Sequence, residues 1–262
     1  MSDVQSQRSI VSAPPPRDGI GISVVSHGQR NLVASLLGEI AAQRDPLVRE
    51  VIVTHNLPDA PLAAPAQGWP FAFTEIFNAT PSGFAANHNR AFAACRMPLF
   101  CVVNPDVELP DPAIWRRLAA AARGPRVGCA YPRLLNGDGS PQDHEREAVT
   151  PFALWRRHVL KRPERRCDWV SGAFWLVPAE AWRAAGGLDE RFHMYCEDAD
   201  FCLRLQLAGF TLAPADAVAR HCAQRASRRP GLRMLWHAAS LVRLWTHPPL
   251  WRFLGTLPKA RQ

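Results

Sequence analysis

Residues 99–106 read Leu-Phe-Cys-Val-Val-Asn-Pro-Asp, and this stretch decides the fold class. The apolar run 99–103 predicts a buried strand, which ends at Pro105 because proline cannot continue a hydrogen-bond ladder. Further strands are predicted at residues 20–26, 51–54, 71–77, 127–131 and 169–177. Helices are predicted after Asn31, over residues 85–94 and over 112–122, the last opened by Asp111 and Pro112. This alternation predicts an α/β fold whose mixed, largely parallel sheet is flanked by helices.

Polar residues follow several of the predicted strands. In such sheets ligands bind beyond the carboxyl ends of the strands. The residues expected there are His27, His55-Asn56, Asn104-Pro105-Asp106 and Pro132-Arg133. A carboxylate in a tight turn at that edge suits a divalent cation, so Asp106 is a candidate ligand for Mg²⁺ or Mn²⁺ bridging to a diphosphate. The alternative is that Asn-Pro-Asp is only a turn, as this composition commonly is.

Three acids within four residues, in Glu197-Asp198-Ala199-Asp200, precede an apolar helix that carries Arg204. The helix dipole favours acids at this end, and Asp200 can pair with Arg204 four residues later. At about 100° per residue, Asp198 points away from that pair and is free to face a cleft. Crowded carboxylates raise one another's pKa, which suits a general base.

His221 is a further candidate. A lone histidine is more often a structural residue than a ligand, but it becomes a plausible second ligand if Asp106 holds a metal.

The ordered set of motifs resembles family 2 glycosyltransferases of the GT-A fold, a Rossmann-like nucleotide-diphospho-sugar transferase fold, in their bacterial rhamnosyltransferase-like branch. The resemblance runs from about Gly19 to about Trp245. It is carried by the strands at 22–26 and 50–56, Gly83-Phe84-Ala85-Ala86-Asn87, Asn104-Pro105-Asp106 in place of the metal-binding DxD, the loop 131–139, the blocks 171–176 and 186–192, and Glu197-Asp198-Ala199-Asp200.

The resemblance implies an inverting, metal-dependent transfer of a sugar, with rhamnose favoured. Asp198, beside Glu197, would be the catalytic base, and Asp106 and His221 would hold Mg²⁺ or Mn²⁺. The donor, a dTDP- or UDP-linked sugar, would be bound by Ser26, His27, His55, Asn56, Asn87, Asn104, Asp106 and Gly172. The acceptor would be a growing cell-surface glycan or a polyprenyl-linked sugar.

Two positions depart from the family pattern. His55-Asn56 stands where many relatives carry an aspartate that reads the nucleobase, and Asn104 replaces the first acid of the metal motif. A neutral ligand lowers metal affinity. A catalytically inactive sugar-nucleotide-binding scaffold of the same fold is therefore the alternative function.

The composition argues against membrane-spanning, secreted and disulfide-linked classes of protein. The 262 residues are 47% hydrophobic, enough for one large domain, and no apolar stretch approaches the roughly 20 residues of a membrane span. The N-terminus lacks the apolar core of a signal peptide, which predicts a cytoplasmic protein. Seven cysteines without a CxxC pair indicate reduced thiols.

The predicted organisation is a disordered tail (residues 1–18), a catalytic domain (19–227) and a basic, Trp-rich helical segment (228–262). The chain has a formal charge of +8, and no acid follows Arg220. Arginines flank an apolar stripe of Leu232, Leu235, Trp236, Leu241, Leu244 and Trp245. Without a nucleic-acid-binding motif, this pattern predicts either peripheral contact with the inner membrane surface or packing on the catalytic domain.

Overall fold

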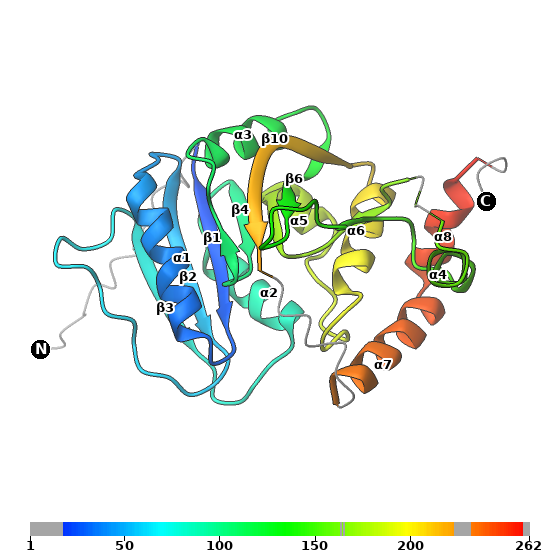
Figure 1. Cartoon of the computed structure of the whole chain (residues 1–262), viewed down its shortest axis with the longest axis horizontal. Coiled ribbons are helices and arrows are strands. Elements are labelled where there is room, and N and C mark those ends of the chain that lie inside the picture. Colours follow the sequence, from blue (N-terminus) through cyan, green and yellow to red (C-terminus); the bar gives the residue numbers. More distant parts are fainter. Residues whose placement is uncertain (1–17, 163, 165, 223–231, 259–262) are drawn as a thin grey trace, which may run out of the picture.

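The computed structural model describes residues 18–162, 164, 166–222 and 232–258. An eight-stranded sheet of order β3-β2-β1-β4-β9-β6-β10-β5 has helices on its faces, and further helices gather at one end of the molecule (Figure 1). The strands are β1 (Ile20–Ser26), β2 (Val48–His55), β3 (Ala72–Phe77), β4 (Leu99–Val103), β5 (Val107–Glu108), β6 (Val127–Leu135), β9 (Phe174–Pro178) and β10 (Thr211–His221). A small second sheet pairs β7 (Glu145–Arg146) with β8 (Trp169–Val170).

The predicted fold class is confirmed. β3, β2, β1 and β4 are parallel neighbours, as are β6 and β10, whereas β9 runs antiparallel to both β4 and β6. α1 (Arg30–Gln43), α2 (Phe84–Ala94) and α3 (Ile114–Ala122) supply crossovers between strands. Successive residues of β2 face opposite hydrophobic clusters, Val51 and Val53 on one side and Ile52 on the other. A strand covered on both faces is apolar throughout, which is why these strands were recognisable in the sequence.

Several predicted boundaries are wrong for local reasons. The residue that precedes α1 is Gln29, not Asn31. Asp111 accepts a hydrogen bond from the amide of Ala113 and so closes a turn ahead of α3 rather than capping the helix. The strand predicted at 169–177 is broken at residues 171–173 into β8 and β9. β6 continues to Leu135, so Pro132-Arg133 lie within it instead of after it.

β10 was not predicted at all. Its sequence, TLAPADAVARH, is rich in alanine and contains Pro214 and Asp216, residues that are depleted in strands. The pairing with β6 shifts register between Pro214 and Val218, so the ladder accommodates these residues by an irregularity. Its position in the sheet comes from tertiary pairing with β6 and β5.

The C-terminal helices pack on the sheet domain. α7 (Leu232–Thr246) and α8 (Pro248–Thr256) share a hydrophobic cluster with α6 (Glu197–Leu207) and the segment around Val149. Within the predicted apolar stripe, Leu244 is fully buried, Trp236, Leu241 and Trp245 are partly buried, and Leu235 is exposed. Trp245 donates its indole N–H to the Val149 carbonyl at 2.8 Å. Packing is therefore what the structure shows for most of the stripe.

Some predictions fall outside the described residues. These are the N-terminal tail, apart from Asp18, the boundary at residues 227/228 and the side chain of Leu232. None of the helices in the described ranges has the length and apolar character needed to cross a membrane.

We expect Leu244→Ala to lower the free energy of unfolding by about 2–5 kcal/mol, because it opens a cavity in the shared cluster. Leu235→Ala in the same helix should stay within about 0.5 kcal/mol of the unchanged protein, because that side chain is exposed. Urea unfolding of both variants makes the measurement. Equal losses in the two variants would contradict the packing of α7.

Candidate active site

The pairing of β10 with β5 brings His221 beside Asp106. The strands are antiparallel with His221 opposite Val107, and the amide of Cys222 donates to the Asp106 carbonyl at 3.0 Å. Nε2 of His221 then lies 3.2 Å from Oδ1 of Asp106, and both side chains are largely buried. Two candidate metal ligands that are distant in sequence thus meet at one point.

Gln142 fixes the orientation of the His221 ring. Its Oε1 lies 2.8 Å from Nδ1 of His221, and its Nε2 donates to the His221 carbonyl at 3.3 Å and to Oδ1 of Asn136 at 3.1 Å. The carbonyl can only accept, so the amide must be oriented with Oε1 toward the ring. Nδ1 therefore carries the proton, and Nε2 directs its lone pair at Asp106 unless it is itself protonated.

This arrangement fits a divalent cation. At 3.2 Å from a carboxylate oxygen, Nε2 of His221 needs either its own proton or a cation between the two atoms. Two donors bound to one ion at right angles and about 2.1 Å from it are about 3 Å apart. A neutral imidazole held by a hydrogen bond at its other nitrogen is the usual protein ligand for such ions. The chemistry and spacing of Asp106 and His221 are therefore compatible with two ligands of one Mg²⁺ or Mn²⁺ ion.

The turn between β8 and β9 connects Asp106 and His221 with the acidic motif, Glu197-Asp198-Ala199-Asp200. The amide of Gly172 donates to Oδ2 of Asp198 at 3.3 Å. The carbonyl of the next residue, Ala173, accepts from the amide of Asn104 at 2.9 Å. Adjacent residues of one turn therefore hold the base candidate on one side and the Asn104–Asp106 turn on the other.

Glu197 and Asp198 begin α6 after two residues with left-handed backbone, Tyr195 and Cys196. Burial raises the pKa of both carboxyls, and the neighbouring Asp198 charge helps to raise the pKa of Glu197 to about 8. Oε2 of Glu197 is buried and has no hydrogen-bond partner in the described part of the chain. Asp198 accepts from the amides of Ala199 and Gly172, which favour its charged form. Asp198 therefore ionises before Glu197.

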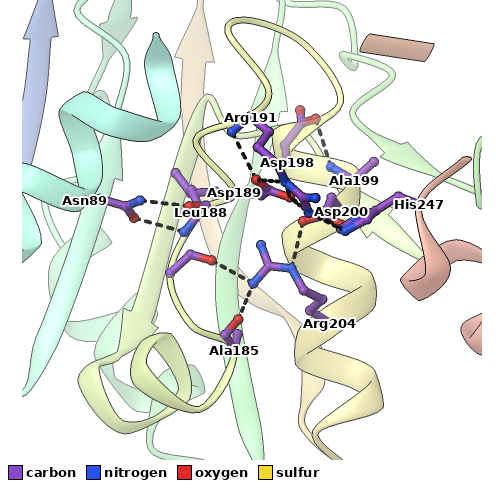
Figure 2. Close-up of polar contacts among 11 residues, drawn as sticks. Asn89, Ala185, Leu188, Asp189, Arg191, Asp198, Ala199, Asp200, Arg204 and His247 are labelled. Carbon is purple, nitrogen blue, oxygen red and sulfur yellow. Dashed lines mark hydrogen bonds and ion pairs between the residues drawn. The ribbon is translucent and has the colours of Figure 1, made fainter. Parts of the chain in front are cut away.

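Asp200 has a different environment, shown in Figure 2. Oδ2 of Asp200 accepts from Nε of Arg204 at 2.7 Å, as the i,i+4 spacing predicts, and Oδ1 lies 2.9 Å from Nδ1 of His247. Arg204 also donates to the carbonyls of Ala185 and Gly187. Asp200 thus ties α6 to the residue that precedes α8, while Asp198 points to Gly172.

Asp189, Asp200 and His247 place three potential metal-ligand atoms within 4.8 Å of one another. Arg204 binds Asp200, and Arg191 binds Asp189 through its Nη2 at 2.6 Å. Two guanidinium groups therefore already balance the two carboxylates. This charge balance favours an ion-pair network over a metal site, and Asp106 with His221 is the better candidate.

Five of the eight predicted nucleotide-binding residues lie near the ends of β1 and β2: Ser26, His27, His55, Asn56 and Asn87. The other three, Asn104, Asp106 and Gly172, lie at the turns described above. His55 is buried, stacks on Phe77 with 4.5 Å between ring centroids, and places Nε2 2.8 Å from Oε1 of Glu75. Asn56 donates to His27 and to the Ser82 carbonyl, and accepts from Asn78 and from the Ser82 amide.

Asn87 and Ser26 of this group also form hydrogen bonds within the chain. Asn87 accepts from Asn78 and donates to the Ser82 carbonyl, and Ser26 accepts from the Gln29 amide. The side chains of Asn56 and Asn87 therefore brace the loop at residues 78–82. Their predicted contact with a nucleotide stays a prediction.

Sequence reasoning missed two residues of the site. Gln142 lies in the loop after β6, and only the loop's first residues, to Gly139, had been connected with function. Arg146, in β7, is near enough for its charge to favour the ionised form of Asp198. Nothing in a single sequence signals that β7 lies beside α6, because the contact depends on its pairing with β8.

Two relatives are similar to this chain in sequence. N-acetylglucosaminyl-diphospho-decaprenol L-rhamnosyltransferase of Mycobacterium tuberculosis is 31% identical over 184 residues, 60% of this chain and 60% of the relative. Rhamnosyltransferase WbbL of Escherichia coli strain K12 is 49% identical over 45 residues, 17% of each protein. The matched part is thus 60% of the mycobacterial relative's length. No family model matches the chain.

Solved structures share the fold. Mannosyltransferase PcManGT from Pyrobaculum calidifontis, in complex with GDP-Man and Mn²⁺, has a TM-score of 0.60 at 16% identity, covering 95% of this chain and 72% of that one. S. aureus TarS in complex with UDP-GlcNAc has a TM-score of 0.52 at 14% identity, covering 83% and 60%. At such identities the likeness shows the fold alone. The resemblance predicted from the motifs is confirmed: the chain has a GT-A fold and is similar in sequence to bacterial rhamnosyltransferases.

The raised pKa of Glu197 predicts a pH-dependent cost to stability. An unfolded glutamate loses its proton near pH 4.3, whereas the folded protein keeps the Glu197 proton up to about pH 8. Between these values the folded state binds more protons, so the free energy of unfolding falls as pH rises. We expect Glu197→Gln to gain stability relative to the unchanged protein from pH 5 to pH 8, by on the order of a few kcal/mol.

Urea unfolding at several pH values measures this difference. Glu180→Gln, at an exposed acid of α5 (Ala179–Ala184), is the matched control and should show no trend. A Glu197→Gln difference that stays constant across the range would show that the folded protein does not retain this proton.

Proposed function

We propose that this chain, similar over 184 residues to a mycobacterial rhamnosyltransferase, is a metal-dependent, inverting glycosyltransferase. It would move a sugar, with rhamnose favoured, from a nucleoside diphosphate to a cell-surface glycan or lipid-linked acceptor. The observation that carries the proposal is the pair of clusters joined by Gly172 and Ala173: Asp198 on one side, and Asp106 with His221 reached through Asn104 on the other.

Asp198 is the proposed general base. Inversion by one in-line displacement needs a carboxylate that takes the proton of the acceptor hydroxyl as that oxygen attacks the anomeric carbon. Two backbone amides orient the Asp198 carboxylate, and the neighbouring Arg146 favours its ionised form. Burial and the Asp198 charge raise the pKa of Glu197 to about 8, whereas two backbone amides and Arg146 oppose the rise in the pKa of Asp198, so Asp198 is the carboxyl that gives up its proton first. This order of ionisation favours Asp198 over Glu197 for the role.

Asp106 and His221 would hold Mg²⁺ or Mn²⁺, with Gln142 fixing the histidine ring. When bound, the cation supplies positive charge against the negative charge that grows on the departing diphosphate. Asn104, at the start of the same turn, would hold the ribose or a metal-bound water. The structural neighbour that contains GDP-Man and Mn²⁺ supports this assignment of the donor side.

The donor and acceptor are inferred from the relatives. The name of the mycobacterial relative contains both L-rhamnose as the transferred sugar and a diphospho-decaprenol acceptor. We therefore favour a dTDP- or UDP-linked rhamnose and a polyprenyl-linked acceptor at the cytoplasmic side of the inner membrane. Ser26, His27, His55, Asn56 and Asn87 would shape the nucleotide end of the site, Asn56 and Asn87 by bracing the loop at residues 78–82.

Asp198→Asn should abolish transfer while leaving donor binding intact. The rate should fall by at least about 10²–10⁴, the usual scale for loss of a general base. Thermal shifts with dTDP, UDP or GDP and Mn²⁺ should match those of the unchanged protein, because the amides that hold residue 198 remain.

Asp216→Asn, at a fully exposed acid of β10, is the control and should transfer normally. Equal turnover by the Asp198 variant and the control would reject Asp198 as the base. If no nucleotide stabilises the protein with or without Mn²⁺ and no transfer occurs, the inactive scaffold becomes the better account.

Gln142→Leu should weaken Mn²⁺ binding about 10–100-fold, the usual effect of losing the partner that orients a metal-bound histidine. Titration by electron paramagnetic resonance in the presence of the nucleotide measures this directly, without turnover. Gln142→Glu keeps an acceptor for the Nδ1 proton of His221, so its loss of Mn²⁺ affinity should be smaller. Gln67→Leu, in an exposed loop, should bind normally. Unchanged affinity in Gln142→Leu would remove His221 from the metal site.

A further inference from the structure

The exposed apolar side chains gather at one end of the molecule. Among the described residues nine large hydrophobic side chains are exposed, and eight of them belong to α7, to α8, or to α4 (Pro151–His158) and the two residues that follow it. The eight are Phe152, Trp155, Val159, Leu160, Met234, Leu235, Val242 and Trp251. Figure 1 shows α4, α7 and α8 together at the end away from α1 and β3. We call this surface the helical end.

A groove joins α4 and α8 within the helical end. A groove of about 510 Å³ lies between α4 and α8 and is lined by Phe152 and Ala153 on one side and Trp251 and Leu254 on the other. The two tryptophans and the phenylalanine keep about half of their surface exposed: Trp155 47%, Trp251 52% and Phe152 61%. Apolar surface of this extent is costly in water and marks an interaction site.

The helices of the helical end themselves contain charged residues of one sign only. Neither residues 151–162 nor residues 232–258 contain an aspartate or glutamate. Lys161, Arg162, Arg243 and Arg252 are exposed, and no ion pair found within the described residues involves them. Exposed aromatic and aliphatic side chains beside unpaired cations are the composition of helices that lie in the headgroup region of anionic membranes.

We propose that the helical end lies on an anionic lipid bilayer, with Phe152, Trp155 and Trp251 entering the headgroup region and Lys161, Arg162 and Arg252 meeting lipid phosphates. The outward face differs from the stripe predicted from the sequence, since Leu244 points inward and the largest exposed rings are on α4 and α8. This deepens the proposed function, because a polyprenyl-linked acceptor has to be reached at such a surface.

Contacts between neighbouring residues connect the groove with Glu197 and Asp198. Glu147, at the end of the groove, follows Arg146, whose charge acts on Asp198. The hydrophobic cluster that buries Leu250 and Phe253 of α8 also contains Cys196 and Ala199, which flank the catalytic pair. The surface of α4 and α8 is therefore connected with the proposed base through Arg146 and through this hydrophobic cluster.

Vesicle flotation of the full chain tests the proposal. We expect binding to phosphatidylcholine vesicles that contain a quarter phosphatidylglycerol at low salt, and weaker binding to pure phosphatidylcholine or at high salt. Lys161→Glu with Arg162→Glu should lower the apparent affinity about tenfold or more. Trp155→Ser with Trp251→Ser should also lower it. Arg49→Glu with Arg96→Glu makes the same charge change at exposed positions outside the helical end and should leave binding unchanged.

Three results would overturn the proposal: no flotation of the unchanged protein at low salt, equal flotation of all three variants, or binding of duplex DNA in place of vesicles with the same variant pattern. Thermal melting confirms that each variant is folded. Transfer to a water-soluble acceptor should be the same in all variants. Vesicle binding without any sugar transfer would reject the proposed function but would still support membrane binding by the helical end.

Discussion

The antiparallel pairing of β5 with β10 is the contact on which the rest of the site depends. β5 has only two residues, yet its ladder aligns His221 with Val107 and is continued by the Cys222–Asp106 backbone bond. The ion pair between Arg220 and Glu108, at 2.9 Å, adds to the same pairing. Gln142 then joins the loop after β6 to His221 through side chain and backbone. A short strand at the sheet edge thus brings together Asp106, His221 and Gln142, which come from three separate parts of the chain.

The start of α6 divides its acids between two tasks. Asp198 points to the turn at Gly172, whereas Asp200, two residues later, is completely buried against Arg204 and His247. Helical geometry makes this division, because residues two apart point to opposite sides of the axis. Glu197 remains next to Asp198 in a buried position without a cation, which raises its pKa. One turn of helix therefore contains two buried carboxyls whose pKa values are raised and a third that forms a structural ion pair.

The sequence predicted those parts of the molecule whose local pattern and tertiary environment agree. β1, β4 and α2 were recognised because apolar runs and helical spacing match their burial, and the family motifs identified Asp106 and Asp198 as site candidates. β10 was missed because its alanine-rich, proline-containing sequence has no strand preference of its own. Gln142 was missed because its importance lies in a hydrogen bond to a residue on that unrecognised strand. The predicted strand at 169–177 was too long because the turn at 171–173, which shapes the site, interrupts an otherwise apolar segment.

His247 makes the C-terminal helices difficult to separate from the rest of the protein. It precedes α8, yet its imidazole contacts Asp200 in the helix that begins with Glu197 and Asp198. A version shortened before α7 would remove the contact between His247 and Asp200, and would uncover the apolar surface that Leu244, Leu250 and Phe253 now cover. The C-terminal helices are thus an integral part of the folding unit. Replacing α7 and α8 with the corresponding helices of a related protein would therefore also alter the environment of Glu197, Asp198 and Asp200.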